Sequence, residues 1–394
     1  MSTAWRDLQA ALAASLDRAE AEGRRRRSRA MTRLPGGRVQ LQDGRRLIDF
    51  SSNDYLGLAL HPAVSGRAAE YAARLGAGSA ASRLVSGTLP EHLAVEARLA
   101  AFKRTEAALL FASGWQANAS VLPALLSMTP GPVRLFADRL IHASLHAGTA
   151  LAGTHEIRFR HNDLEHLDRL LAAPEAQGAT RVIVTESVFS MDGDRADLMG
   201  LVSLADRHGA ILYVDEAHAT GVLGPSGGGL CADLPPEAPV VVMGTLGKAL
   251  GGFGAYVAGP KVLIDTLVQA CGGFIYSTAP PPAVLGALDA ALDIAPGMDE
   301  ARATLLDHAK TVRAAAGAKG LQTFGSSSQI VPIGFGSEPA ALRAMAAMED
   351  AGLLAVAIRP PTVPRGSSRL RLTLSAVHGA EDVALLIDAI GALK

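Results

Sequence analysis

The chain has 394 residues, enough for two or three structural units of about 150 residues each. Hydrophobic residues make up 49%, aromatic residues 4% and charged residues 19%, a composition that excludes a largely disordered chain. Lys and Arg number 37, Asp and Glu number 38, and the formal net charge is -1. Because this balance gives no overall field, we expect no nucleic-acid partner and expect anionic ligands to be bound by local clusters.

The N-terminal segment lacks the pattern of a secretory signal. Trp5, Leu8, Leu12 and Leu16 are spaced as on one face of an amphipathic helix, and the basic run 24–27 follows this helix instead of preceding an apolar stretch. The two cysteines lie far apart in the sequence, without the neighbouring ligands of a zinc site. We therefore expect a cytoplasmic protein with reduced thiols and no metal site.

The middle of the chain alternates short runs of branched apolar residues with longer stretches of helical periodicity. This alternation predicts a doubly wound α/β fold, with a largely parallel sheet and helices on both of its faces. The predicted strands are Ala107–Phe111, Val133–Ala137, Arg181–Thr185, Ala210–Val214 and Val240–Met243, and the predicted helices are Glu91–Phe102, Ala117–Leu126, Asp163–Leu171 and Leu198–His208.

The pattern changes after the prolines at 280–282. Alanine-rich helices follow, with predicted strands at Gln329–Gly334, Leu353–Ile358 and Arg369–Leu374 and a closing helix. We predict three units: an N-terminal helix and arm over residues 1–45, a large α/β domain over 46–290 and a smaller C-terminal α+β domain over 291–394. The N-terminal helix is expected to join the small domain in space.

The apolar stretch 238–259 has the length of a membrane span, but it holds Lys248 near its centre and six glycines. A central lysine opposes insertion by ~2.5–3.5 kcal/mol, so we expect no membrane span. Such surroundings instead favour the neutral, nucleophilic amine that Schiff-base chemistry requires. The alternative is an ordinary lysine whose amine reaches solvent from a loop.

Polar residues at predicted strand ends favour the first interpretation. Asp215 and His218 follow the strand that ends at residue 214, and the carboxyl ends of parallel strands are where open α/β sheets bind ligands. A carboxylate suits the protonated pyridine nitrogen of pyridoxal phosphate, and we assign this place to Asp215. His218 lies close enough in sequence to contact the phenolic oxygen of the cofactor.

The phosphate of such a cofactor would be held by backbone N–H groups at a helix start and by hydroxyl groups. Gly114 and Trp115 open the helix that follows the strand 107–111. Ser190 and Thr245 supply hydroxyl groups after two other strands. Each is an ordinary loop or capping residue when taken alone, so the prediction depends on their combination.

Seven segments together resemble the α-oxoamine synthase family of fold-type I pyridoxal-phosphate enzymes. They cover nearly the whole chain in the family's order and are SSNDYLGL from Ser51, SRLVSGT from Ser82, ADRLIHASL from Ala137, ESVFSMDGD from Glu186, VDEAHATG from Val214, GTLGKALGG from Gly244 and IYST from Ile275. The segment AIRPPTVPRGSSRLRLTLSA from Ala357 resembles the branch that forms 8-amino-7-oxononanoate more than the glycine acyltransferases or aminolevulinate synthases.

This resemblance implies a role for each matching residue. Lys248 would bind pyridoxal 5'-phosphate covalently and act as the Cα base, Asp215 would contact the pyridine nitrogen and His218 the phenolate oxygen. His142 would stack over the ring. The residues implied at the phosphate are Gly114, Trp115, Ser190 and Thr245, together with Ser277 and Thr278 from the neighbouring subunit of a homodimer with shared active sites.

The resemblance also implies the substrates. Asn53, Thr362 and Arg371 fall on substrate positions of the family, and Arg371 suits a bidentate contact with an amino-acid carboxylate. Counting back from Asn53 selects Arg27 as a further substrate residue, although any arginine of the run 24–27 fits. The implied reaction condenses L-alanine with a pimeloyl thioester, of coenzyme A or a carrier protein, to 8-amino-7-oxononanoate, CO₂ and free thiol in biotin biosynthesis.

Several alternatives remain open at this stage. Another α-oxoamine synthase activity, such as glycine C-acetyltransferase, would use the same motifs. Residues 224–228 fit G-x-S-x-G, which would make Ser226 a hydrolase nucleophile with His378, but a proline precedes this serine and no strand leads directly into it. His142 and His146 have the spacing of metal ligands without the intervening Glu of H-E-x-x-H. The sequence also departs from the family's usual residues at Trp115, at Glu216 and in the GAGSAASR segment at 76–83.

Overall fold

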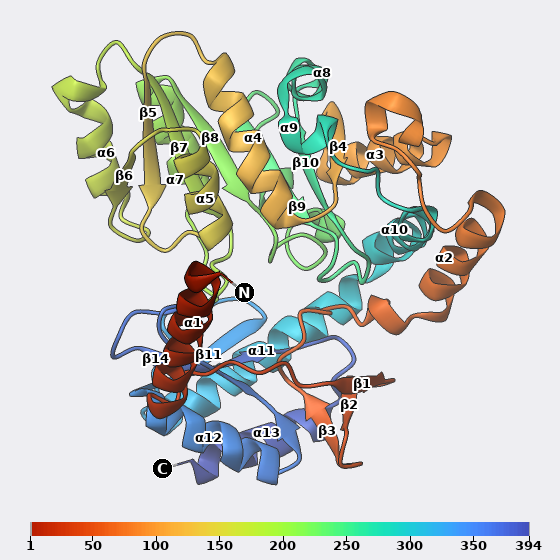
Figure 1. Ribbon diagram of the computed structural model, residues 1–394, viewed down its shortest axis with the longest axis vertical. Coiled ribbons are helices and arrows are strands. Elements are labelled where there is room, and N and C mark those ends of the chain that lie inside the picture. Colours follow the sequence, from red (N-terminus) through yellow and green to blue (C-terminus); the bar gives the residue numbers. More distant parts are fainter. Residues whose placement is uncertain (1, 394) are drawn as a thin grey trace.

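A computed structural model describes residues 2–393 and contains two domains (Figure 1). The larger domain is built around a seven-stranded sheet of order β4-β10-β9-β8-β7-β5-β6 in which only β10 is antiparallel to its neighbours. Its strands are β4 (Ala107–Phe111), β5 (Val133–Asp138), β6 (Glu156–Phe159), β7 (Thr180–Glu186), β8 (Ala210–Asp215), β9 (Val240–Thr245) and β10 (Ala255–Gly259). The predicted α/β class and the five predicted strands are confirmed.

Helices cover both faces of this sheet (Figure 1). Alternate residues of β4 belong to separate buried clusters, with Leu110 in one and Leu109 and Phe111 in the other. Both faces are therefore apolar, which explains the unbroken hydrophobic runs in the sequence. The helices of this domain are α2 (Pro62–Leu75), α3 (Pro90–Lys103), α4 (Gly114–Met128), α5 (Ala143–Leu151), α6 (Leu164–Ala172), α7 (Leu198–His208), α8 (Lys261–Ala270), α9 (Gly272–Ile275) and α10 (Pro282–Ile294).

The smaller C-terminal domain is α+β, as predicted. Three antiparallel strands form a sheet of order β11-β14-β13, and its buried residues Leu370 and Leu372 share a core cluster with Leu246 and Leu250 of the large domain. The two domains are therefore packed through one continuous apolar interior. The elements are α11 (Asp299–Ala318), β11 (Ile330–Gly336), α12 (Glu338–Asp350), β13 (Val356–Ile358), β14 (Ser368–Thr373) and α13 (Ala380–Ala392).

A second small sheet has the order β1-β2-β3-β12. It joins β1 (Met31–Leu34), β2 (Arg38–Leu41) and β3 (Arg46–Asp49) to the two-residue strand β12 (Leu353–Leu354), which runs parallel to β3. The single strand predicted at 353–358 is therefore wrong. The chain there divides between two sheets, because β12 pairs with β3 whereas β13 pairs with β14.

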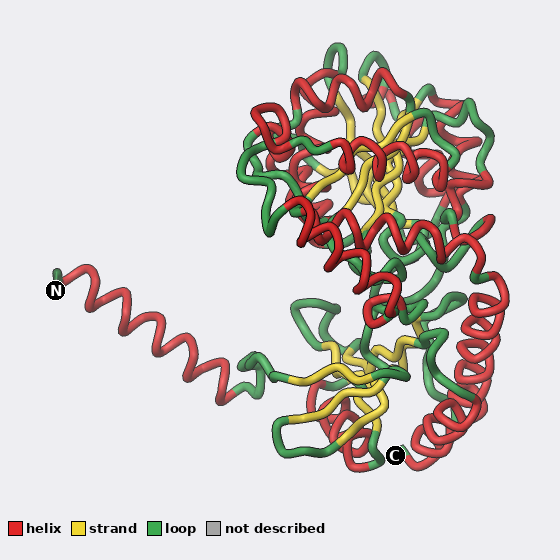
Figure 2. The backbone as a smooth tube through the Cα atoms, turned by 90° about the vertical axis from the view of Figure 1, so that its right-hand side faces the viewer, coloured by secondary structure: helices red, strands yellow, loops and turns green. Residues whose placement is uncertain are grey.

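The N-terminal helix α1 (Thr3–Ala21) extends away from both domains (Figure 2). It has no buried residue, and its apolar side chains Trp5, Leu8, Leu12 and Leu16 are about half exposed. The expectation that this helix packs on the small domain is wrong, since it is the arm and the strands after the helix that contact that domain. Among the described residues no helix is both long and apolar enough to cross a membrane, and the stretch 238–259 forms β9 and β10.

A buried ion pair anchors the chain beyond β8 to α3. Nζ of Lys103 lies 2.6 Å from Oε2 of Glu216, and both side chains are 0% exposed. The other carboxylate oxygen accepts from the N–H of Cys231 at 2.9 Å, and the Lys103 ammonium also donates to the carbonyl of Gly228. Because Glu216 directly follows the strand end at Asp215, this ion pair fixes the start of the loop that carries His218.

Replacing only one member of this pair leaves a buried charge without a partner. Lys103→Met is expected to lower the free energy of unfolding by about 3–5 kcal/mol in denaturant titrations. Adding Glu216→Gln removes the orphaned charge and should recover part of that loss. The matched control is Lys261→Met, which breaks an exposed pair with Asp265 and should change stability by less than about 1 kcal/mol. Equal losses of unfolding free energy in Lys103→Met and Lys261→Met would contradict a stabilising role for the buried pair of Lys103 and Glu216.

Candidate active site

A cavity of about 220 Å³ lies where the carboxyl ends of β7, β8 and β9 meet. Neighbouring parallel strands end at the same edge of a sheet, so the residues that follow them are brought together there. Seven predicted site residues line this cavity, together with others that were not predicted. The lining consists of Gly114, Trp115, Asn118, His142, Ser144, Glu186, Asp215, Ala217, His218, Met243, Thr245 and Lys248.

Lys248 lies in the loop between β9 and β10, with its amine directed at the cavity. Its Nζ lies 2.9 Å from Nε2 of His218. Loss of solvent and the charge of Arg371 together lower the pKa of Lys248 to about 8, against the opposing effect of the Asp215 carboxylate. A far larger fraction of the amine is therefore neutral near physiological pH than for an ordinary lysine, and the neutral form is a nucleophile and a base.

Asp215 ends β8 and is 4% exposed. Its Oδ2 accepts from the side-chain amide of Asn118 at 2.9 Å and its Oδ1 from the N–H of Ala217 at 2.8 Å. Asn118 is itself oriented, because its carbonyl oxygen accepts from the hydroxyl of Tyr213 at 2.9 Å and its amide donates to Ser144 at 3.0 Å. Hydrogen bonds donated to a carboxylate stabilise its charged form, so the site holds an oriented negative charge.

His218 connects Lys248 to the small domain. Its Nδ1 lies 2.7 Å from the hydroxyl of Tyr55, and its backbone carbonyl accepts from the Gln329 side chain at 2.8 Å. Burial lowers the pKa of His218 well below its usual value, and the charges of Lys248 and Arg371 lower it further. The imidazole is therefore neutral and retains one nitrogen donor for a ligand oxygen or for the lysine.

The wall of the cavity is formed by two helix starts. His142 precedes α5 and accepts from the N–H of Ser144 at 3.2 Å, and its ring is exposed to solvent at the cavity. Gly114 begins α4, and a Cβ atom there would lie 2.6 Å from Cγ2 of Thr245. Only glycine therefore allows α4 to begin this close to the end of β9, with its N–H groups facing an anion site.

Arg371 is a residue of the small domain whose positive charge acts on Lys248 and His218 at the cavity. From β14 it donates through Nε to the carbonyl of Ser190 at 2.6 Å and through Nη1 to Oδ1 of Asn53 at 3.2 Å. Arg371 is 8% exposed and takes part in none of the ion pairs of residues 2–393. A buried guanidinium without a carboxylate partner suits an anionic ligand.

A model of the aminotransferase class I and II family matches residues 45–390. The chain belongs to this family. It is 57% identical over 98% of its length to a putative 8-amino-7-oxononanoate synthase of Bordetella bronchiseptica, 96% of which is covered. It is 56% identical over 89% of its length to the 8-amino-7-oxononanoate synthase of Gluconacetobacter diazotrophicus, 88% of which is covered.

Solved structures agree with this family. Serine palmitoyltransferase from S. paucimobilis with a bound PLP–myriocin aldimine superimposes with a TM-score of 0.89 at 28% identity, over 97% of this chain and 96% of that one. The 8-amino-7-oxononanoate synthase from Francisella tularensis gives 0.75 at 27% identity, over 87% and 96%. The fold is thus that of the fold-type I enzymes, the chain is an enzyme, and the predicted resemblance to α-oxoamine synthases is confirmed.

Several predicted site residues lie outside the cofactor cavity. Arg27 and Thr362 line a second cavity of about 420 Å³ with the rest of the 24–27 run, and Arg27 is paired there with Glu20 at 2.8 Å. Ser277 accepts from the Gln116 side chain at 2.6 Å, and the neighbouring Thr278 is exposed. These positions leave the predicted roles of the four residues as proposals.

Sequence reasoning missed several residues at or beside the site, and those with polar side chains nearest the predicted groups are Tyr55, Asn118 and Glu186. Glu186 directly follows the predicted strand 181–185, so the strand-end argument that selected Asp215 applies equally to it. Tyr55 and Asn118 carry no such signal, since they reach the site from a loop and from the middle of α4. Only the folded structure shows that Tyr55 contacts His218 and that Asn118 contacts Asp215.

The structure does not support Ser226 as a hydrolase nucleophile. Ser226 lies in a short 3₁₀ turn at a φ of 49°, and no strand leads directly into it. His378 contacts the N–H of Ser375 and the carbonyl of Asp49. The glycines of this loop instead allow close packing, because a Cβ atom at Gly229 would lie 2.2 Å from Oε2 of Glu216.

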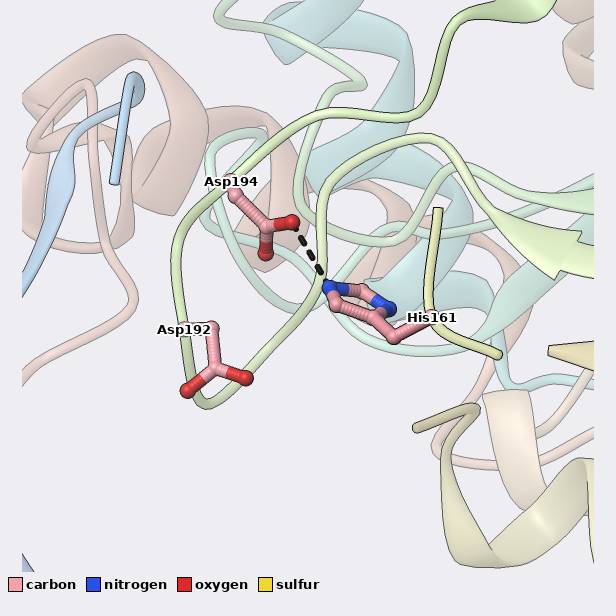
Figure 3. A group of neighbouring side chains, drawn as sticks. All are labelled: His161, Asp192 and Asp194. Atoms are coloured by element: carbon pink, nitrogen blue, oxygen red, sulfur yellow. Dashed lines mark hydrogen bonds and ion pairs between the residues drawn. The ribbon is translucent and has the colours of Figure 1, made fainter. Parts of the chain in front are cut away.

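Two groups with the spacing of metal ligands already have other partners. His146 contacts the carboxylate of Glu156 at 2.7 Å. His161 lies beside Asp192 and Asp194 (Figure 3), but its Nε2 is 2.8 Å from Asp194 and its Nδ1 3.0 Å from Asp138. These two carboxylates raise the pKa of His161 to about 10. A protonated imidazole has no lone pair for a metal.

The lowered pKa of Lys248 predicts the pH dependence of its reactivity. Labelling of its amine by acetic anhydride, followed by mass spectrometry, should increase through a midpoint near pH 8 as the ammonium loses its proton. Labelling of the exposed Lys261 in the same samples serves as the internal control. A Lys248 midpoint near 10.5, the unshifted value, would show that the amine is not desolvated.

Proposed function

We propose that the protein binds pyridoxal 5'-phosphate and condenses L-alanine with a pimeloyl thioester, releasing CO₂ and free thiol. The product would be 8-amino-7-oxononanoate, an intermediate of biotin biosynthesis. The observation that carries this proposal is the contact of Lys248 with His218 beside the oriented carboxylate of Asp215. The relatives named 8-amino-7-oxononanoate synthase, at 47–57% identity, support the choice of substrates.

The described residues fit this cofactor. Asp215 offers an ionised carboxylate to the pyridine nitrogen, His218 a neutral imidazole to the phenolic oxygen, and Lys248 an amine to the aldehyde. The start of α4 at Gly114 and the hydroxyl of Thr245 suit the phosphate. When bound, the cofactor supplies an electron-poor pyridinium ring that takes up negative charge from the substrate Cα.

The chain's own residues would then move the protons. The Lys248 amine takes the proton from Cα of alanine, so that this carbon can bond to the thioester carbonyl carbon while the thiolate leaves and takes a proton from solvent. The bond from Cα to the carboxylate breaks next and releases CO₂, and the Lys248 ammonium returns a proton to the same carbon. Asp215 would keep the pyridine nitrogen protonated, and His142 on the cavity wall would stack over the ring.

Two anion sites match the two ends of the substrates. Arg371, held by Ser190 and Asn53, would bind the carboxylate of alanine. The cavity lined by the 24–27 arginines and Thr362 would bind the distal carboxylate of the pimeloyl group, with Arg27 as its principal contact. Both assignments rest on local positive charge in a chain whose net charge is only -1.

We propose further that the active form is a homodimer with shared active sites. Ser277 and Thr278 do not line the cofactor cavity of their own chain, and they would reach the phosphate of the neighbouring subunit. Large apolar side chains are exposed nearby, including Trp115 at 55% and Tyr276 at 85%. Exposed apolar surface of this kind is typical of a protein interface.

Purified protein incubated with each amino acid and several acyl thioesters tests the reaction. Release of free thiol should be fastest with L-alanine and a pimeloyl thioester, whether the carrier is coenzyme A or a carrier protein, and mass spectrometry should detect 8-amino-7-oxononanoate. Lys248→Ala should release no thiol above background. Faster release with glycine and an acetyl thioester would contradict the proposal and favour a glycine C-acetyltransferase.

The assignment of Arg371 predicts an effect confined to the amino acid. Arg371→Gln should raise the KM for alanine at least about tenfold, because a hydrogen-bonded charge pair contributes about 1.5–3 kcal/mol. The KM for the thioester should change much less. Arg365→Gln, at an exposed position of the same domain, is the matched control. Equal effects on the two substrates would contradict the assignment.

The assignment of Arg27 predicts an effect confined to the acyl thioester substrate. The wild-type protein should prefer a pimeloyl thioester to its distal methyl ester, which lacks the negative charge. Arg27→Gln should reduce this preference several-fold without changing the KM for alanine. The same change at each of the residues 24, 25 and 26 identifies the arginine that binds the carboxylate. A preference that survives all four changes would exclude this cavity as the binding site.

A further inference from the structure

Glu186 is a second carboxyl group at the cofactor cavity. It ends β7 and lies directly beside Asp215 in the parallel register of β7 and β8, and both residues line the cavity. Glu186 is 2% exposed. Its Oε1 is fully buried and has no hydrogen-bond partner among residues 2–393.

The two neighbouring carboxyl groups differ in their donors. Both oxygens of Asp215 accept hydrogen bonds, from Asn118 and from Ala217, whereas Oε1 of Glu186 has no donor among the described residues. Two adjacent carboxylates in a buried site repel each other, so one of them retains its proton. The proton is expected on Glu186, because its Oε1 has no donor and an ionised oxygen without a donor is the more costly one to bury.

The charged and titratable groups around Glu186 lead to the same conclusion. Burial raises the pKa of Glu186 well above its usual value, and the Asp215 charge raises it further. The Lys248 ammonium and the backbone N–H groups of His142 and Ser190 oppose this change without reversing it. Burial lowers the pKa of both imidazoles at the cavity, those of His142 and His218, so neither adds a positive charge that would ionise Glu186.

We propose that Glu186 is a positioning residue that stays protonated in the resting protein, so that of the two strand-end carboxyls only Asp215 is ionised. This inference rests on the proposed function, in which Lys248 must be neutral to react. An ionised Glu186 would raise the pKa of Lys248 and hold its amine as an unreactive ammonium. By keeping its proton, Glu186 leaves one negative charge for the pyridine nitrogen and adds no second one that would stabilise the lysine ammonium further.

Infrared difference spectroscopy on the full-length protein, as purified with its cofactor, tests the protonation state directly. The Glu186→Gln minus wild-type spectrum at neutral pH should show loss of a protonated carboxylic C=O band. The matched control, Asp215→Asn, should show loss of a carboxylate band instead. Loss of a carboxylate band in Glu186→Gln would overturn the proposal.

Isotope labelling keeps the test decisive if Glu186→Gln fails to fold. Wild-type protein carrying ¹³C-carboxyl glutamate should show its protonated C=O band shifted relative to unlabelled protein. Burial also raises the pKa of Asp49 and Asp54, and a label confined to glutamate separates these aspartates from Glu186. If no protonated band shifts with the label at neutral pH, Glu186 is ionised and the proposal is wrong.

The effect on Lys248 tests the positioning role. In cofactor-free protein, Glu186→Gln should leave the pH midpoint for labelling of the Lys248 amine unchanged, because one neutral group replaces another. Asp215→Asn should lower that midpoint, since the Asp215 charge raises the pKa of Lys248. A midpoint lowered equally by both changes would overturn the proposal. Neither readout needs turnover, so failure of the proposed reaction would leave these results standing.

Discussion

The alignment of β7, β8 and β9 is the constraint on which the rest of the site depends. Because these strands are parallel, Glu186, Asp215 and Thr245 end at one edge of the sheet. The turn after β9 then brings the amine of Lys248 to 2.9 Å from His218, which follows β8. The buried ion pair of Lys103 and Glu216 fixes the start of the loop that carries His218, and so helps to hold His218 in contact with Lys248.

The small domain completes the site electrostatically. Its strand β14 supplies Arg371, whose positive charge lowers the pKa of both Lys248 and His218. The same guanidinium is free of carboxylate partners in residues 2–393 and suits a substrate anion. One side chain therefore favours the neutral lysine and, under the proposed function, would also bind the amino acid, and the continuous core of the two domains holds it in place.

The sequence predicted those parts of the structure that depend on local pattern. Continuous apolar runs marked the buried strands, and the polar residues directly after them marked the cavity. Long-range pairing was not predictable in this way: residues 353–358 divide between two sheets because their partners, β3 and β14, lie far away in the chain. Asn118 was missed for the same reason, since only the packing of α4 on the sheet brings it to Asp215.

The central claim is that Lys248 is the amine that binds the cofactor aldehyde. Borohydride reduction of the purified protein, followed by proteolysis and mass spectrometry, tests this claim most directly. The account predicts a phosphopyridoxyl group on the peptide that contains Lys248 and its absence from Lys248→Ala. The group on another lysine, or retained in Lys248→Ala, would contradict it.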